Sequence, residues 1–262
     1  MIVGNFVPGE GDLHAIMANR FIQKLEGLNS LSADDFAILE HLTSRPRDYA
    51  AKQDLIREGD RPGPVFIMLE GWACRYKILP NGSRQIMAFL LPGDSCDLHV
   101  GILAEMDHSL QAITPAKVAL ISGEEMATML DDHPRIAAAL YKSQLIDEGT
   151  LRAWIVSMGR RSSIERVAHL MCELYLRTVA ANGLPEGEVA LPISQIIFAD
   201  ALGMTPVHIN RILRELREAG AMAFSRGSLR VIDPVKLVQI AGFDENYLHR
   251  RKTRQPVALP AY

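Results

Sequence analysis

The spacing of apolar residues divides the chain into a helical start, a strand-rich middle and a second helical part. Helices are expected over Ala15–Leu25 and over Ala33–Leu42, the second behind Ser32 as its N-cap. From the end of the second helix to residue 122 the chain has short apolar runs, and glycines at 59, 71, 82 and 93 recur every 11 or 12 residues. Short strands with a glycine at each corner favour a β-sandwich or β-roll. The expected strands are Val65–Leu69, Trp72–Leu79, Gln85–Leu91, Leu110–Ile113 and Val118–Ile121.

The helical signal then returns. Glu124–Leu130 predicts a short helix, and residues 134–158 predict a long one that begins at a proline. A helix of roughly 24 residues spans about 36 Å, which exceeds what closing a small core requires. We therefore expect an interdomain strut or a dimer seam. Residues 159–163 interrupt the pattern and predict a domain boundary, and a further helix is expected over Ile164–Ala181 with Asn182-Gly183 as its C-cap.

Residues 194–220 carry the pattern of a helix-turn-helix. The small Ala199 lies where the second helix would cross the first, and Gly203 suits the positive φ of a tight turn. Thr205-Pro206 supplies an N-cap hydroxyl followed by proline at the first helical position, and Gly220 follows the second helix. The apolar seam between the two helices would consist of Phe198, Leu202, Met204, Ile209 and Ile212.

The opposite face of the second helix predicts contacts with DNA bases. Val207, Asn210, Arg211 and Arg214 follow the spacing i, i+3, i+4 and i+7, so they share one side. Arginine bonds bidentately to guanine, asparagine to adenine, and a valine contacts the thymine methyl group. The alternative is an αα-hairpin with a solvated basic face. The cap, the turn glycine and the seam, all in register, favour the DNA-binding interpretation.

A hairpin is expected directly after this motif. Met222–Phe224 and Leu229–Ile232 are apolar runs on either side of Ser225–Ser228, which places Arg226 at the tip. Such a hairpin resembles the wing of a winged helix, and its cation suits contact with phosphate.

Charge and cysteine content agree with an intracellular DNA-binding protein. The 262 residues carry a net charge of −3. Residues 1–159 hold 14 Lys and Arg against 21 Asp and Glu, whereas residues 160–262 hold 14 against 10. The basic half is thus the one with the helix-turn-helix. Three separated cysteines indicate a reducing compartment, and neither a signal peptide nor an apolar run of about 18 residues is present, so we expect a cytoplasmic protein without membrane contact.

The sequence gives no indication of catalysis. It contains no GxSxG elbow, no phosphate-binding glycine loop and no HExxH pair. We therefore predict that the protein is not an enzyme.

From about residue 28 to 243 the chain resembles the Crp/Fnr family, the cyclic-AMP receptor and fumarate–nitrate regulators. The resemblance rests on these motifs: REGD (Arg57–Asp60), LEG (Leu69–Gly71), NG (Asn81-Gly82), LLPGD (Leu90–Asp94) and ADALGMTPVHINRILREL (Ala199–Leu216). It implies an α+β fold with an N-terminal cyclic-nucleotide-binding-like β-roll (jelly roll), a long dimerisation helix and a C-terminal winged helix-turn-helix. The corresponding divisions are residues 1–133, 134–159 and 160–243, followed by a basic, flexible tail over 244–262.

The same resemblance implies a homodimer on a palindromic double-stranded DNA site, with RNA polymerase as a protein partner. Phosphate contacts fall on Ser194, Gln195 and Thr205, and base contacts on residues 206–214. With the wing, the expected DNA-binding residues are Ser194, Gln195, Thr205, Pro206, Val207, His208, Asn210, Arg211, Arg214 and Arg226. Position 207 holds valine where many members carry a glutamate, so a different operator sequence should follow.

The β-roll departs from the cyclic-nucleotide pattern. Binders place Gly-Glu-Leu after the LxxGD turn, followed by an arginine that neutralises the cyclic phosphate. Here Asp97 and Leu98 stand at the glycine and glutamate positions, and no Lys or Arg occurs between Arg84 and Lys117. A buried phosphate without a cation is costly, so cyclic AMP is not the expected effector. An iron–sulfur cluster needs about four cysteine ligands, which three isolated cysteines do not supply.

One alternative stays open. Cys96, Asp97, His99 and His108 lie near one another in sequence and could ligate a metal or haem. Their spacing matches no familiar metal motif, so plain packing is the favoured interpretation, no metal ligand is assigned and the cofactor stays unknown. The competing function is a module that senses an effector, a metal or haem and acts mainly through protein contacts.

Overall fold

The computed structural model describes residues 19–98, 102–182 and 188–250. Helix α2 (Arg20–Leu28) replaces the expected Ala15–Leu25 helix, whose beginning lies outside the described residues. Helix α3 (Ala33–Thr43) begins behind Ser32 as predicted. Ser32 accepts from the backbone N–H of Asp35 while the Asp35 carboxylate accepts from that of Ser32, which satisfies two amides that the first turn would otherwise leave unpaired.

The middle of the chain forms two four-stranded antiparallel sheets, as the glycine-punctuated pattern predicted. One has the strand order β1-β8-β3-β6 and the other β2-β7-β4-β5. The strands are β1 (Arg47–Tyr49), β2 (Asp54–Ile56), β3 (Val65–Glu70), β4 (Ala73–Ile78), β5 (Arg84–Leu90), β6 (Ser95–Cys96), β7 (Ser109–Ala112) and β8 (Ala116–Ile121). Of these eight strands, β1, β2 and β6 had no counterpart among the expected strands.

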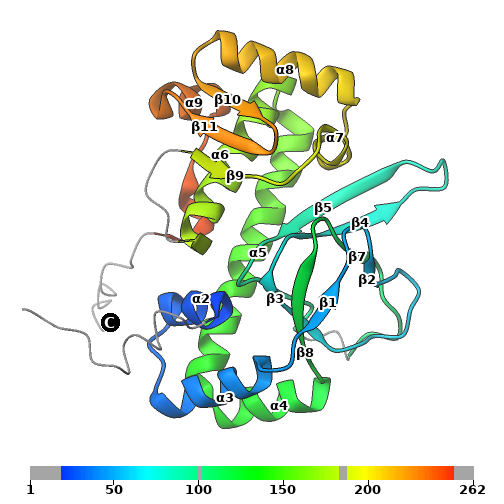
Figure 1. Cartoon of the computed structure of the whole chain (residues 1–262), viewed down its shortest axis with the longest axis vertical. Helices are drawn as coiled ribbons and strands as arrows, with labels where there is room; N and C mark the ends of the chain where they lie inside the picture. Colours follow the sequence, from blue (N-terminus) through cyan, green and yellow to red (C-terminus); the bar gives the residue numbers. More distant parts are fainter. Residues whose placement is uncertain (1–18, 99–101, 183–187, 251–262) are drawn as a thin grey trace, which may run out of the picture.

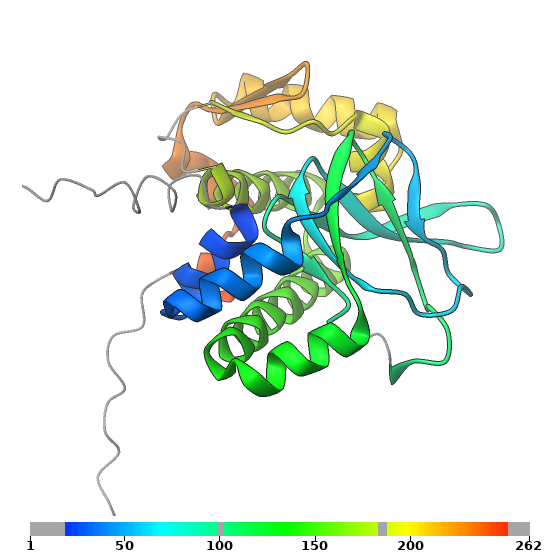
Figure 2. The same cartoon turned by 60° about the horizontal axis from the view of Figure 1, so that its bottom comes forward.

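Helix α4 (Gly123–Asp132) is followed by the long helix α5 (Pro134–Arg160), which passes through the centre of the molecule (Figure 1). Helices α2, α3 and α4 gather near the N-terminal half of α5, and the two sheets lie to one side (Figure 2). The helical conformation is interrupted between the end of α5 at Arg160 and the beginning of α6 (Ser163–Asn182). This interruption lies within residues 159–163, the stretch that the sequence predicted as a boundary. The expected C-cap at Asn182-Gly183 extends outside the described residues.

The C-terminal part combines three short strands with small helices. Its elements are β9 (Glu188–Ala190), α7 (Gln195–Leu202), α8 (Pro206–Glu218), β10 (Met222–Ser225), β11 (Ser228–Val231), α9 (Pro234–Ala241) and the 3₁₀ helix η2 (Glu245–Leu248). The three strands form one antiparallel sheet in the order β10-β11-β9. In the described chain no helix is long and apolar enough to cross a membrane.

Element η2 corrects the expectation of a flexible tail from residue 244. Leu248 is buried and the Tyr247 hydroxyl donates to Glu173 at 3.0 Å, so the segment packs on α5 and α6. The expectation of a flexible tail rested on the basic residues that follow this segment, whereas Tyr247 and Leu248 attach it to the fold. Residues 251–262 lie outside the described part. The division into domains stays a prediction.

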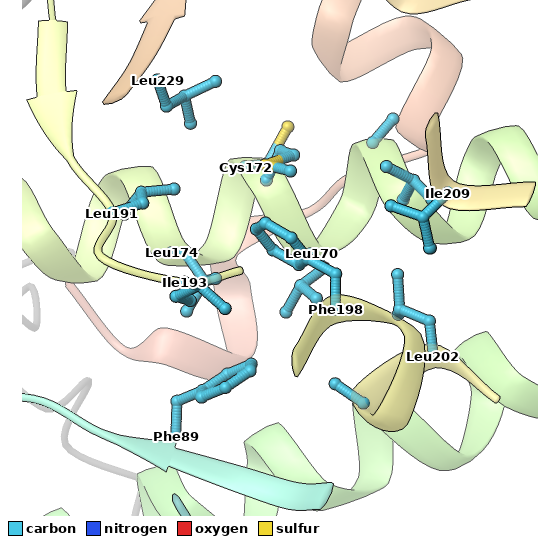
Figure 3. Packing of buried hydrophobic residues seen from close by; sticks show 14 of the residues in the cluster. Phe89, Leu170, Cys172, Leu174, Leu191, Ile193, Phe198, Leu202, Ile209 and Leu229 are labelled. Carbon is cyan, nitrogen blue, oxygen red and sulfur yellow. The ribbon is translucent and has the colours of Figure 1, made fainter. Parts of the chain in front are cut away.

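A continuous apolar core joins the β-roll to the C-terminal part. Phe89 of β5 makes edge contacts with Trp72 and with Trp154 of α5, at ring-centroid distances of 6.4 and 5.9 Å. On its other side it points toward Leu174 of α6 and Ile193 (Figure 3). The helix-turn-helix is therefore held against the β-roll in this conformation.

Candidate DNA interface and neighbouring cavity

The two helices of the motif begin and end where the sequence placed their signals. Ser194 accepts from the backbone N–H of Ile197, and Thr205 accepts from that of His208, with proline at the first turn of α8. Gly203 has φ +63° and ends α7 in the left-handed conformation that glycine adopts without steric cost. These local signals fix the angle at which α8 leaves the turn.

The predicted contact residues lie on the surface, and the seam lies inside. Nine of the ten are exposed and His208 is half-buried. Val207, at the start of α8, is 80% exposed, whereas Ile209, Ile212 and Leu216 on the opposite side are buried. In Figure 1, α8 runs along one end of the molecule, away from the two four-stranded sheets. Which of these residues touch DNA stays a prediction.

The exposed cations of this surface have no neutralising carboxylate in the described part of the chain. Across the described residues, no carboxylate lies within salt-bridge distance of Arg211, Arg214 or Arg226. Asn210 is different, because its Nδ2 donates to Oε1 of Gln195 at 2.7 Å. This bond joins a predicted base-reading residue on α8 to a predicted phosphate-contacting residue on α7. Spacing along either helix could not reveal it.

The wing is present as a tight hairpin. Strands β10 and β11 pair from Met222 with Val231 to Ser225 with Ser228, which leaves Arg226 and Gly227 as a two-residue turn. Both have positive φ, +52° and +74°. Glycine favours this conformation, whereas arginine seldom adopts it, so the turn holds a cationic side chain at a strained backbone position. The sequence did not predict strand β9, which adds to β11 and braces the wing from its other side.

Two side chains that the sequence did not single out hold the helix-turn-helix against the rest of the protein. Arg166 of α6 donates to the carbonyl oxygens of Leu202, at the end of α7, and Met158, near the end of α5, at 3.0 and 3.1 Å. Gln85 of β5 donates to the carbonyl of Ala201 at 3.2 Å. Each uses carbonyls that a helix end leaves without a partner, so only the folded arrangement reveals them.

A buried polar network lies at the junction of the β-roll, α5 and α6. Glu173 has no exposed surface and accepts from Trp154 Nε1, from the Tyr247 hydroxyl and from Arg177, at 3.0, 3.0 and 3.2 Å. Arg177 also contacts Asp94 of the LLPGD turn at 2.9 Å. Burial raises the pKa of Glu173 even though Arg177 opposes the shift.

Asp94 behaves in the opposite way. Burial alone would raise its pKa, but the charges of Lys24 and Arg177 and the backbone N–H of Leu91 lower it to about 2. Lys24 comes from α2 and lies 2.8 Å from the Asp94 carboxylate. Asp94 of the LLPGD turn thus forms ion pairs with both α2 and α6.

A cavity of about 580 Å³ lies between the β-roll and α5. Its wall includes Arg75, which comes from β4 and lies outside the cation-free stretch between residues 84 and 117. The conclusion that the β-roll cavity has no cation is therefore wrong. Arg75 is already engaged, because its guanidinium contacts Cys96 Sγ at 3.1 Å and Asp97 at 3.6 Å. Four carboxylates also line the cavity, on Asp97, Asp107, Asp147 and Glu148.

Cys96, Asp97 and His108, three of the four residues considered as metal ligands, come together at the edge of this cavity. His99 lies outside the described residues.

Comparison with known proteins finds a family model that matches each half of the chain. Residues 165–240 match the Crp-like helix-turn-helix domain, and residues 46–133 match the cyclic nucleotide-binding domain. The nitrogen fixation regulation protein FixK of Bradyrhizobium diazoefficiens is 29% identical over 213 residues, which cover 81% of this chain and 88% of FixK.

The chain belongs to the Crp/Fnr family of transcription regulators. Another relative, the transcriptional activator protein FnrL of Cereibacter sphaeroides, is 26% identical, with 82% of this chain and 87% of FnrL covered. Among solved structures, FixK2 from Bradyrhizobium japonicum superposes with a TM-score of 0.67 at 24% identity, covering 75% of this chain and 96% of FixK2. Family membership therefore identifies the protein as a transcription regulator with an α+β fold, and members of this class are not enzymes.

Proposed function

We propose that this Crp/Fnr regulator binds a two-fold symmetric double-stranded DNA site as a homodimer and reads its bases with α8. The observation that carries the proposal is the outward face of α8, where Arg211 and Arg214 are exposed and no carboxylate of the described chain neutralises them. Cations left free on the surface of a helix that projects from the fold are available for phosphates and guanine edges.

Dimer formation is supported by an exposed apolar strip on α5. Leu145, Ile155 and Val156 are 54, 72 and 53% exposed on a helix otherwise packed on both sides. A second copy of α5 would cover them and would set the two copies of α8 on successive turns of one DNA face. Ile155→Glu should then give a monomer in sedimentation experiments, whereas Val238→Glu, at an exposed apolar position on α9, should leave the dimer intact.

The DNA contacts are tested by deleting single cations. Arg211→Ala should weaken binding to the selected site by about 1–3 kcal/mol and relax the preference at one base position. Arg226→Ala should weaken binding to all sequences about equally and reduce the salt dependence, because its proposed partner is a phosphate. Lys236→Ala, an exposed cation on α9, is the matched control and should change neither.

We further propose that cyclic AMP is not the effector. The carboxylates of Asp97, Asp107, Asp147 and Glu148 face the cavity that a nucleotide would fill, and Arg75 is held by Cys96 and Asp97. The field inside the cavity is therefore unfavourable for a phosphate. Calorimetric titration with cyclic AMP should give no heat of binding at millimolar ligand, and a saturable micromolar isotherm would refute this part. RNA polymerase is the proposed protein partner, and transcription in vitro from the selected site tests it.

A further inference from the structure

Three potential metal ligands of different chemistry meet at the rim of the β-roll cavity. The Sγ of Cys96, a carboxylate oxygen of Asp97 and a ring nitrogen of His108 all lie within 4.8 Å of one another. Cys96 Sγ is 2.9 Å from Asp97 Oδ2, and His108 Nε2 is 3.3 Å from the same oxygen. Cys96 ends β6, whereas His108 lies just before β7, so the fold rather than sequence spacing brings them together.

The histidine is oriented in the way that metal-binding histidines usually are. Its Nδ1 lies 2.7 Å from the carboxylate of Asp107, which fixes the ring and leaves Nε2 directed at Asp97. Nε2 is buried and makes no well-directed hydrogen bond with any described residue. A carboxylate behind one ring nitrogen, with the other nitrogen free to coordinate, is the common outer-shell arrangement at zinc sites.

The other two donors are also held in place. Asp97 has φ +62°, a strained conformation for a residue other than glycine, and this places its carboxylate beside the thiol. The Arg75 guanidinium donates from Nε to Cys96 Sγ at 3.1 Å. A metal-bound thiolate accepts such a bond better than a neutral thiol does, and the arginine charge favours the ionised sulfur.

We propose that Cys96, Asp97 and His108 bind one divalent transition-metal ion of the Zn²⁺ type, with a fourth coordination position open to the cavity. Tetrahedral zinc has donors at about 2.0–2.3 Å from the ion, which sets the donors roughly 3.4 Å apart. The three ligands therefore need only small shifts to close around an ion. Binding breaks the S–H bond of Cys96 and releases that proton to solvent, and the thiolate with the carboxylate balances the charge of the ion.

The open position gives the site a consequence beyond structural support. Asp97 and His108 line the cavity together with Ile102 and Leu103 and with Leu151 of α5. A small molecule inside that cavity could reach the ion in place of water, as in metal sites with three protein ligands. The inference does not depend on DNA binding.

The test uses untagged, full-length protein treated with a chelator and titrated with Co²⁺, with Zn²⁺ content measured by elemental analysis after dialysis. We expect one ion per chain and a thiolate-to-cobalt charge-transfer band. Cys96→Ser should abolish the band, whereas Cys172→Ser, at a buried thiol in α6, should keep it. Asp107→Asn should weaken Co²⁺ affinity about 10- to 100-fold through the oriented histidine.

His108→Gln and Asp107→Asn decide the matter if Cys96→Ser does not fold, because Asp107 is 78% exposed and its substitution leaves the core untouched. The proposal is overturned if the Zn²⁺ content is well below one ion per chain and the Co²⁺ titration gives no charge-transfer band. It is equally overturned by a band that all three variants retain. Either result would make the cluster an ion pair between Arg75 and Asp97 packed on a thiol, and would leave the proposed DNA binding unaffected.

Discussion

Replacing Arg177 by methionine should destabilise the protein by about 3 kcal/mol. Removing one partner of a buried ion pair costs roughly 3–5 kcal/mol, because the other charge stays buried without compensation. Asp94 keeps Lys24 at 2.8 Å and therefore loses little. Glu173 has no exposed surface and keeps only the neutral donors Trp154 and Tyr247, so most of the cost falls there.

The assay is thermal and urea unfolding followed by tryptophan fluorescence, since Trp154 donates directly to Glu173. At about 2–4 °C per kcal/mol for chains of this size, the melting temperature should fall by roughly 6–12 °C. Arg57→Met removes a pair with Asp54 in which the arginine is 72% exposed and Asp54 keeps Tyr76 and Gln111 as donors, so it should cost less than about 1 kcal/mol. Arg177→Met combined with Glu173→Gln should be more stable than Arg177→Met alone. If the melting temperature of Arg177→Met falls by less than about 2 °C, the reasoning is refuted.

Two further predictions concern pH and a turn. Burial, aided by the charge of Arg161, lowers the pKa of His169 to about 4, so the unfolded imidazole binds a proton first and stability should decline as pH falls from about 6.5 to about 4. His169→Phe should flatten that part of a urea-midpoint profile, and an unchanged slope would contradict it. Gly71 and Gly82 share φ +81°, but only at Gly71 would a Cβ meet backbone, 2.3 Å from the Pro115 oxygen. Gly82→Ala should therefore cost about 1–2 kcal/mol and Gly71→Ala clearly more, and equal losses in chemical denaturation would argue against the steric account.

The sequence predicted those elements whose ends are determined by interactions between residues close together in the chain. Ser32 begins α3, Thr205-Pro206 begins α8 and Gly203 lies in the turn, because each satisfies or releases a backbone group within a few residues. The strands β1, β2 and β6 are three residues or fewer, too short for a period to emerge. They form because longer neighbours offer them free backbone groups.

Long-range contacts account for what the sequence did not reveal at the site. Glu173 and Arg177 follow the i, i+4 spacing of an ordinary surface pair. Glu173 is nevertheless buried and Arg177 mostly buried, because Trp154 of α5 and Tyr247 of η2 pack on Glu173 while Asp94 of the β-roll pairs with Arg177. Arg75 lines the cavity from β4, a strand outside the stretch between residues 84 and 117. The nearness of Cys96 and Asp97 was evident from the sequence, whereas the orientation of His108 by Asp107 depends on the loop that carries both.

The decisive measurement is selection of bound sites from random DNA by the full-length protein, followed by titration of the enriched site with the parent protein and with Arg211→Ala. We predict one enriched palindrome bound by a dimer, with affinity that falls steeply with salt. Arg211→Ala should lose about 5- to 150-fold in affinity on that site, with the selectivity relaxed at one base position in each half-site. Selection of no palindrome, or an unchanged affinity in the variant, would contradict the assignment of α8 as the reading helix.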